Sequence, residues 1–197
     1  DNEFDGFVAR FSNDLGTLVQ STYFGGGRGD FAAGIAVDAG GNVYIAGATA
    51  SSTLPGTAGA AQPSHSTQTD SFDAFVAKFD GTLTSLARAT YLGGGGSDIA
   101  NGLALDAHGN VFVAGHTSST NFPGTAGGAQ PTFAGAAGKD DAFVARLNGA
   151  LTVLTQATFL GGNQTDRATA IVLDASGNAF VAGRTQSPNF PVTAGVA

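Results

Sequence analysis

The sequence predicts an all-β fold built from three copies of one 68-residue unit, and three observations support this prediction. The segment Asp38–Asn42 recurs at Asp106–Asn110 and Asp174–Asn178, each time 68 residues further along. A fixed period of this kind indicates a repeat architecture. The short apolar runs between these segments show no helical period. Glu3 is the only glutamate beside fourteen aspartates, a bias towards turn residues and away from helix formers.

Four short apolar runs occur in each unit, separated by turn signals. In the first unit the runs are Gly6–Phe11, Leu18–Phe24, Ala33–Val37 and Val43–Gly47. Their length and their content of Val, Ile, Phe, Tyr and Thr are typical of β-strands. Small residues alternate with Ile35 and Val37 in the third run, so we expect a sheet that is covered on both faces.

The recurring five-residue segment predicts a tight hairpin turn between the third and fourth strands. Its aspartate can bond the backbone of its own turn, and its second glycine supplies the positive φ that such a turn requires. We prefer this turn role to a metal-ligand role. The expected turn residues are Asp38, Gly41, Asn42, Asp106, Gly109, Asn110, Asp174, Gly177 and Asn178.

A long connection follows the fourth strand, at residues 51–71, 119–139 and in the tail from Ser187. Its recurring Leu54, Phe122 and Phe190, each directly before a proline, suggest a loop that is pinned by one buried side chain.

Four antiparallel strands per unit describe the blade of a β-propeller. The alternative, a parallel β-helix, has shorter coils and needs no hairpin turn in every unit. We predict one propeller-type array over residues 1–197 with three blade equivalents. Its repeats span approximately residues 1–68, 69–136 and 137–197.

Several segments resemble the SBBP class of bacterial β-propeller repeat, and the segment around Asp106 also resembles the NHL repeat. The segments are Asp73–Lys78, Thr90–Gly94, Ala100–Asp106, Gly109–Gly115 and Phe122–Pro123. The resemblance implies an extracellular or cell-surface scaffold without shared catalytic residues. It also implies that the third and fourth strands of a unit form the inner half of a blade, and that the first and second form the outer half. The structural blades would then be offset from the repeats, with half-blades at both termini.

Composition narrows the classes of function. A net charge of −7 leaves no basic face for a nucleic acid. Without cysteine, the chain has no disulfide framework, no thiol chemistry and no cysteine-ligated zinc. No apolar run reaches the length of a membrane span, so we expect no membrane insertion.

The leading functional hypothesis is a non-enzymatic, exported structural or interaction module that needs no cofactor. Its expected partners are copies of itself or further repeats of a longer parent chain. The alternative is a propeller that recognises a glycan or a surface peptide at the channel mouth, through loops such as residues 25–30, with calcium as an aid. An enzyme would use residues that break the repeat, such as His108 and His116, but no catalytic constellation is visible.

One metal hypothesis follows from the positions of Asp30, Asp98 and Asp166, just before the expected innermost strands. A ring would gather these carboxylates at one mouth of the channel, where hard oxygen ligands suit calcium. The preferred alternative is that each aspartate caps its own loop.

Other motifs have simpler interpretations. We interpret the adhesion tripeptide Arg28–Asp30 as a chance match, and Gly93–Asp98 lacks the tandem copies that a calcium roll requires. His65, like the other two histidines, has no partner that the sequence reveals. The recurring Arg10, Lys78 and Arg146 are interpreted as solvated charges on an outer face.

The ends of the array predict its assembly. It would begin with an outer strand pair and end with an inner one, and three blades are too few to close a ring. Each unpaired edge would need a partner. Head-to-tail pairing of copies would give a ring of six to eight blades or a fibre.

Overall fold

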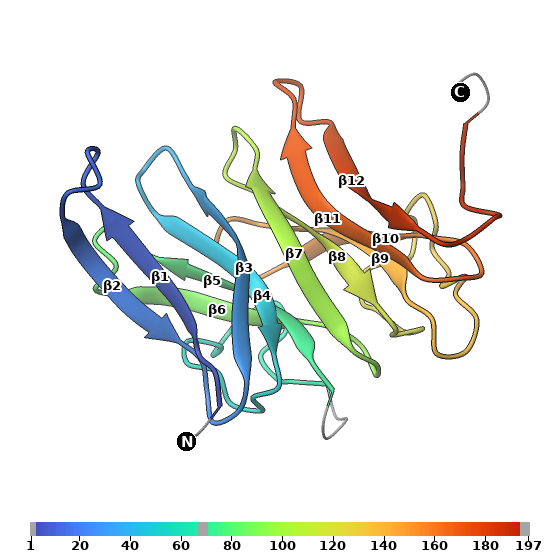
Figure 1. Ribbon diagram of the computed structural model, residues 1–197, viewed down its shortest axis with the longest axis horizontal. Helices are drawn as coiled ribbons and strands as arrows, with labels where there is room; N and C mark the ends of the chain where they lie inside the picture. Colours follow the sequence, from blue (N-terminus) through green and yellow to red (C-terminus); the bar gives the residue numbers. More distant parts are fainter. Residues whose placement is uncertain (1–2, 67–70, 194–197) are drawn as a thin grey trace.

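The computed structural model describes residues 3–66 and 71–193, and over these residues it contains twelve strands and no helix (Figure 1). Accordingly, no helix in the described ranges could span a membrane. Residues 67–70 of the predicted connection and residues 194–197 of the predicted tail lie outside the described part. The strands are β1 (Gly6–Phe11), β2 (Leu18–Phe24), β3 (Asp30–Val37), β4 (Val43–Thr49), β5 (Asp73–Phe79), β6 (Leu86–Leu92), β7 (Asp98–Leu105), β8 (Val111–Thr117), β9 (Asp141–Leu147), β10 (Leu154–Leu160), β11 (Asp166–Leu173) and β12 (Ala179–Thr185).

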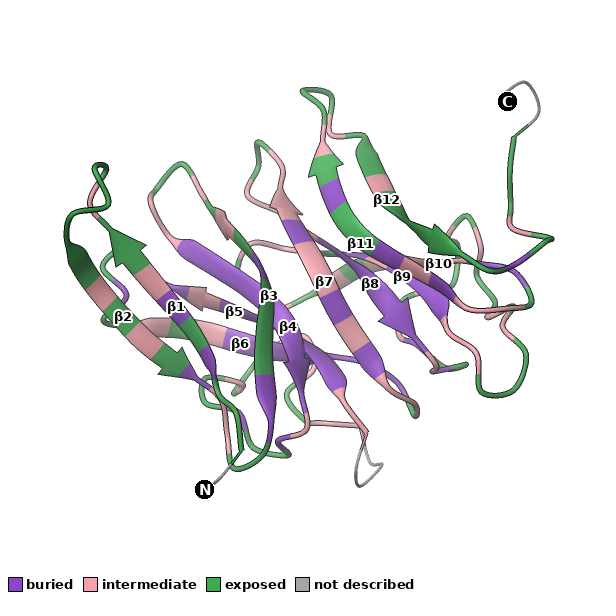
Figure 2. Cartoon of the chain, viewed as in Figure 1, coloured by how far each residue is buried: buried purple, intermediate pink, exposed green. Residues whose placement is uncertain are grey.

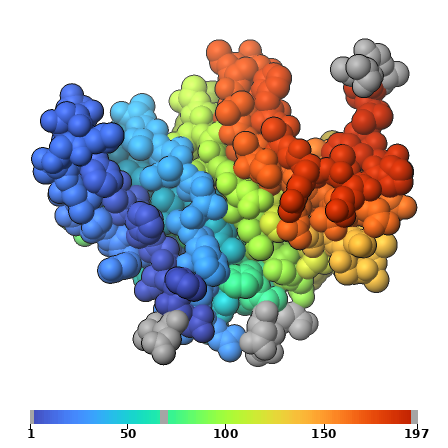
Figure 3. Space-filling view, in the orientation of Figure 1, coloured from blue at the N-terminus to red at the C-terminus, as the bar shows by residue number. Residues whose placement is uncertain are grey.

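The strands form four antiparallel sheets that lie side by side in chain order (Figures 1 and 3). Two sheets have four strands, in the orders β3-β4-β5-β6 and β7-β8-β9-β10. Two have only two strands, β1-β2 and β11-β12. The third and fourth strands of one sequence unit therefore share a sheet with the first and second strands of the next unit. Neighbouring four-stranded sheets meet through β7, which packs against β3, while its other side packs against β11.

The expected bounds of two strands were wrong. Strand β3 begins at Asp30 rather than Ala33, and β4 continues to Thr49 rather than ending at Gly47. The two added ends pair with each other, Asp30 opposite Thr49. The error arose because aspartate normally favours loops, whereas the amide of Asp30 donates to the Phe4 carbonyl at 2.7 Å.

The core lies between neighbouring sheets and is concentrated in the two four-stranded ones (Figure 2). Tyr44 on β4 reaches across to the second four-stranded sheet, where it clusters with Leu103 and Phe143. Its hydroxyl donates to the Gly149 carbonyl at 2.9 Å. Strands β2 and β12 are mostly exposed and β1 is half exposed, so the core thins out at both ends of the row of sheets.

The long connections are pinned by the buried side chains of Leu54 and Phe122, as predicted, whereas the third predicted residue, Phe190, is only half-buried. Tyr91 holds the first connection through its hydroxyl, which accepts from the Leu54 amide at 2.8 Å and donates to the Ser51 carbonyl at 3.0 Å. One phenol thereby satisfies two backbone groups of a segment that lacks regular structure.

The turn before the second strand of each unit carries a leucine in the left-handed region, with φ values of 59°, 58° and 57° at Leu15, Leu83 and Leu151. An L-residue occupies this region at a cost of about 1–2 kcal/mol. Burial of Leu83 and Leu151 offsets this cost, but Leu15 is 76% exposed.

We expect Tyr91→Phe to destabilise the fold by about 1–3 kcal/mol, because it leaves the buried Leu54 amide without an acceptor. In a domain of this size each kcal/mol lowers the melting temperature by about 2–4 °C. The matched control is Tyr23→Phe, the same position one unit earlier, where the side chain is 79% exposed. Thermal unfolding followed by circular dichroism measures both, and equal melting temperatures would contradict the pinning role.

Candidate functional site

The three aspartates of the metal hypothesis each begin a strand and are completely buried. In each case Oδ2 accepts from a glycine amide four residues earlier and from a serine hydroxyl in the following connection. For Asp98 these donors are Gly94 N at 2.9 Å and Ser119 Oγ at 2.8 Å, and Thr117 Oγ1 bonds the other oxygen. The corresponding bonds join Asp30 to Gly26 and Ser51, and Asp166 to Gly162 and Ser187. Each carboxylate thus ties its glycine loop to the connection that follows.

A second row of buried aspartates faces the first. Asp73 and Asp141 begin β5 and β9 and are also completely buried. Gly161 lies between two carboxylates, because a Cβ there would be 2.6 Å from Asp141 Oδ1 and 2.9 Å from Asp166 Oδ2. Sequence reasoning missed this row, although its signal was present as Asp5, Asp73 and Asp141 at a spacing of 68 residues.

Burial perturbs these acids. It raises the pKa of Asp98 to about 7, and the charge of Asp73 adds to the effect. It likewise raises the pKa of Asp141 to about 6, with Asp166 as a contributor. Between about pH 4 and pH 7, the folded protein therefore holds protons that the unfolded chain has already released. Stability from these groups is accordingly lost as the pH rises through that window.

We expect the melting temperature to fall by several degrees between pH 5 and pH 8. Asp98→Asn should reduce this dependence because it removes the main titrating group while keeping an acceptor oxygen. Asp174→Asn is the control, since the Asn178 side chain holds the pKa of this exposed carboxyl below its usual range. Unfolding scans across this pH range test the idea, and an unchanged slope in Asp98→Asn would contradict it.

The calcium hypothesis has a limited geometric basis. Within the described residues, no group of three or more His, Asp or Glu is placed to hold a metal ion. The three predicted ligands Asp30, Asp98 and Asp166 instead bond their own loops, as the capping alternative proposed. The calcium site stays a prediction.

Chelation provides the test. Amides and hydroxyls already occupy Oδ2 of all three carboxylates, although Oδ1 of Asp30 and of Asp166 has no hydrogen-bond partner among the described residues. Because each carboxylate is already bound within the protein, we expect excess chelator to leave the melting temperature unchanged. An ion that binds only the folded state would raise that temperature in proportion to its occupancy. A reproducible rise on adding calcium after chelation would therefore support the metal site and contradict our expectation.

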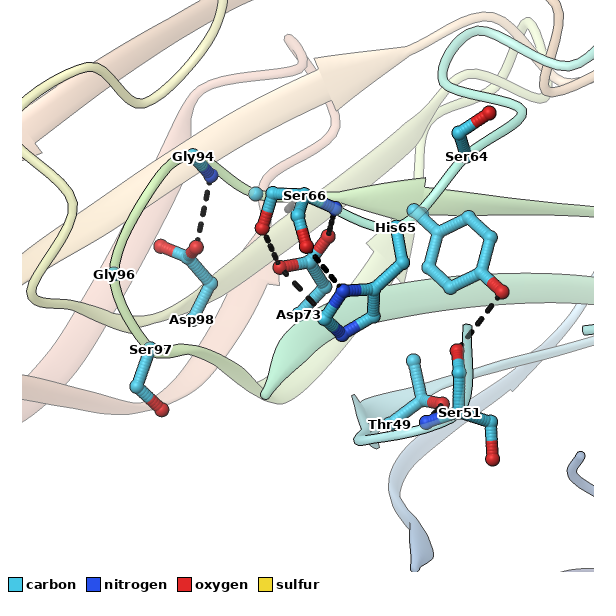
Figure 4. A network of polar contacts seen from close by, with 12 residues as sticks. Thr49, Ser51, Ser64, His65, Ser66, Asp73, Gly94, Gly96, Ser97 and Asp98 are labelled. Carbon is cyan, nitrogen blue, oxygen red and sulfur yellow. Dashed lines mark hydrogen bonds and ion pairs between the residues drawn. The ribbon is translucent and has the colours of Figure 1, made fainter. Parts of the chain in front are cut away.

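A cluster around Asp73 brings together three side-chain types of hydrolase chemistry (Figure 4). Ser66 Oγ bonds directly to Asp73 Oδ1, while His65 Nδ1 faces the Ser66 carbonyl. His65 Nε2 is 4.0 Å from Asp73 Oδ1. A serine nucleophile needs its hydroxyl on the imidazole, whereas here it is on the carboxylate. These contacts hold the loop in place; they do not form a catalytic triad.

The other histidines lie apart from each other. His116 on β8 is nearly buried and contacts Asn101, whose amide also donates to the Ala168 carbonyl at 2.6 Å. Burial, aided by the charge of Arg167, lowers the pKa of His116 to about 4. His108 is exposed in a hairpin turn, where its amide donates to Asp106.

The adhesion tripeptide has its acid inside the protein. Asp30 is completely buried and bonds Gly26 and Ser51, so its carboxylate cannot reach a receptor from this conformation. This geometry agrees with the interpretation of the tripeptide as a chance match.

The hairpin turns form a network around one carboxylate. Asp38 Oδ1 accepts from the amides of Gly40 and Asn42 at 2.9 and 2.8 Å, and Oδ2 accepts from Asn42 Nδ2. Gly41 has φ of 84°. The same bonds recur around Asp106 and Asp174.

The recurring basic residues are not simply solvated outer-face charges, as we had interpreted them. Lys78 Nζ donates to the Gly149 carbonyl of the next sheet at 3.3 Å, and Arg10 Nη1 donates to the Gly81 carbonyl at 3.1 Å. Arg146 pairs with Asp106 at 3.4 Å. These side chains bridge structural elements, which the period-2 pattern of a strand cannot reveal.

The edge of β1 that faces away from β2 is unpaired among the described residues, and apolar side chains surround it. Phe7 is 69% exposed, whereas Phe75 and Phe143, its counterparts in the four-stranded sheets, are completely buried. Phe11 is also exposed, although its counterpart Phe79 is buried. The N-terminal strand pair thus exposes to solvent apolar side chains whose counterparts are buried in the four-stranded sheets.

The C-terminal strand pair has the complementary open edge, on β12. Phe180 is 58% exposed, while its counterpart Tyr44 is 1% exposed. Ala182 is exposed as well, although the corresponding Ala46 and Ala114 are completely buried.

A groove lies beside each open edge. The groove beside β1 holds about 530 Å³, and it is lined among others by Val8, Arg10, Val37, Gly81 and Leu83. The groove beside β12 holds about 200 Å³, and its lining includes Leu160, Arg167, Gly183 and Phe190. Both are apolar recesses that touch a sheet edge.

Comparison with known families agrees with this architecture. The family description "Beta-propeller repeat", of the SBBP type, matches residues 21–55 and 88–123. Each matched segment runs from the second strand of one unit through the turn motif to the start of the long connection. No curated protein matches the chain significantly.

Proposed function

The chain carries SBBP beta-propeller repeats, and from this premise we propose that it is a non-enzymatic, exported structural module that assembles head-to-tail with copies of itself. In this proposal each four-stranded sheet is a propeller blade. The pair β1-β2 is then an outer half-blade, and β11-β12 is an inner half-blade. The resemblance to repeats of secreted and surface proteins supports the proposed export.

The observation that carries the proposal is the pair of open edges with exposed apolar side chains. An unpaired strand edge is a template for another strand, and natural proteins usually cover it. Here Phe7 is exposed at one edge and Phe180 at the other, although Phe75 and Phe143, the counterparts of Phe7, and Tyr44, a counterpart of Phe180, are buried. Pairing β12 of one copy with β1 of the next would cover both edges at once.

Closure within one chain is not available, because β1-β2 and β11-β12 lie at opposite ends of the molecule (Figure 1). Propellers close with about four to eight blades. Two copies, each with three blade equivalents, would give a six-bladed ring if the rotation between sheets permits closure. A head-to-tail contact that does not close runs on as a fibre.

We expect the purified chain to have a solution mass of at least twice its 19.4 kDa. Analytical ultracentrifugation over a range of concentrations measures this mass and separates a closed pair from a growing fibre. A mass that stays at twice the chain mass indicates the ring, and a mass that climbs with concentration indicates the fibre. A well-folded monomer at every concentration would contradict head-to-tail assembly.

A further inference from the structure

In each four-stranded sheet the second strand pairs with the third, β4 with β5 and β8 with β9, and we call these two pairings the complete junctions. Both contain the same kind of cross-strand cation–aromatic pair. Tyr44 on β4 lies opposite Lys78 on β5, and Phe112 on β8 lies opposite Arg146 on β9. Lys78 Nζ is 4.9 Å from the centroid of the Tyr44 ring, and Arg146 Cζ is 5.3 Å from that of Phe112. Such contacts strengthen when water is excluded from them.

A third pair of this kind is divided between the two ends of the chain. Its aromatic member is Phe180 on β12, and its cationic member is Arg10 on β1. Arg10 already has the bridging bond of its counterpart, since it donates to the Gly81 carbonyl as Lys78 does to Gly149. What Arg10 lacks, within the described residues, is the aromatic ring opposite it.

The groove beside β1 is the place where that ring would lie. In the complete junction, Tyr44 clusters with Leu103 and Leu151 and bonds Gly149. The residues 68 positions earlier in the chain, among them Gly81 and Leu83, line the groove of about 530 Å³. Arg10 lines it as well.

A second contact runs in the opposite direction. In both complete junctions a phenylalanine lies opposite a glycine, Phe75 with Gly47 and Phe143 with Gly115. Phe143 also packs against Phe122, with 4.5 Å between ring centroids.

The corresponding parts at the open edges are again on different ends. Phe7 on β1 is exposed, and the groove of about 200 Å³ beside β12 is lined by Gly183 and Phe190, which correspond to Gly115 and Phe122. Each open edge therefore carries one projecting ring and one empty recess for the ring of the other edge.

We propose that each open edge is the seat of a second copy of this chain, held in a single register by Phe180 against Arg10 and by Phe7 against Gly183 and Phe190. This inference rests on the proposed head-to-tail assembly and specifies its partner. The antiparallel register is the one that both complete junctions share, so Ala179 lies opposite Phe11 of the second copy. A one-residue slip would point Phe180 and Phe7 away from their recesses. A foreign strand could bond the edge backbone, but it would leave both recesses empty.

A mutant cycle tests the first contact. Phe180→Ala and Arg10→Gln should each weaken association by about tenfold or more, because each removes one member of a desolvated cation–aromatic pair. The double variant should associate only slightly less tightly than the weaker-binding single variant, since both changes remove the same contact. Val153→Ala is the matched control, an exposed apolar position within the second four-stranded sheet's outer turn, and should leave association unchanged. Ultracentrifugation gives the association constants, and melting curves verify that each variant folds.

Mixing two variants, each blocked at a different edge, tests whether the two open edges bind each other. Phe7→Asp should block one edge and Ala182→Asp the other, because the counterparts of both positions are completely buried. Each variant retains one intact edge of opposite kind, so a mixture should form one-to-one pairs, while each variant alone stays monomeric. A monomeric wild-type chain would overturn the proposed assembly itself. A wild-type chain that assembles, with Phe180→Ala and Arg10→Gln behaving as Val153→Ala, would overturn the register alone and point to backbone pairing without these rings.

Discussion

The first residue of the strand at each sheet-to-sheet contact holds three separate parts of the chain together. The amide of Asp98 donates to the carbonyl of Phe72, directly before β5 of the preceding sheet, while its carboxylate binds the glycine loop and Ser119 of the next connection. Because Asp98 is completely buried, loss of any of these bonds would leave an unpaired polar group inside the protein. The spacing of the sheets, and with it the size of the recesses between them, depends on this anchor.

That anchor also explains why the glycine loops do not accept larger residues next to the buried aspartates. Gly93 lies so close to Asp73 and Asp98 that a Cβ would approach their oxygens to 2.9 and 2.6 Å. The glycines are therefore required by the approach of two acids rather than by turn conformation. Burial is the main cause of the raised pKa of Asp98, and the nearby carboxylate of Asp73 adds to it because two close negative charges favour retention of a proton.

Much of the architecture could be predicted because the physics is local and repeated. The hairpin turn at Asp38 and the strand runs follow from side-chain chemistry within a few residues, and the period places them three times. The start of β3 could not be predicted, because Asp30 is drawn into the strand by the distant Phe4 carbonyl. The bridging role of Lys78 was missed for the same reason, since its partner lies 71 residues away. The open edges themselves follow from the order of strands, but the recesses beside them depend on packing between sheets.

Leu15 connects local strain with the state of the neighbouring edge. At the equivalent Leu83 and Leu151, burial compensates for a left-handed backbone, whereas at Leu15 solvent surrounds the side chain. The β1-β2 hairpin therefore carries a conformational cost without the packing that repays it elsewhere. Hairpins that lack such packing open locally at a low free energy, well below the free energy of global unfolding. The N-terminal hairpin would exchange its amide hydrogens faster than either four-stranded sheet, and its protection would report how much of the protein is docked at a given moment.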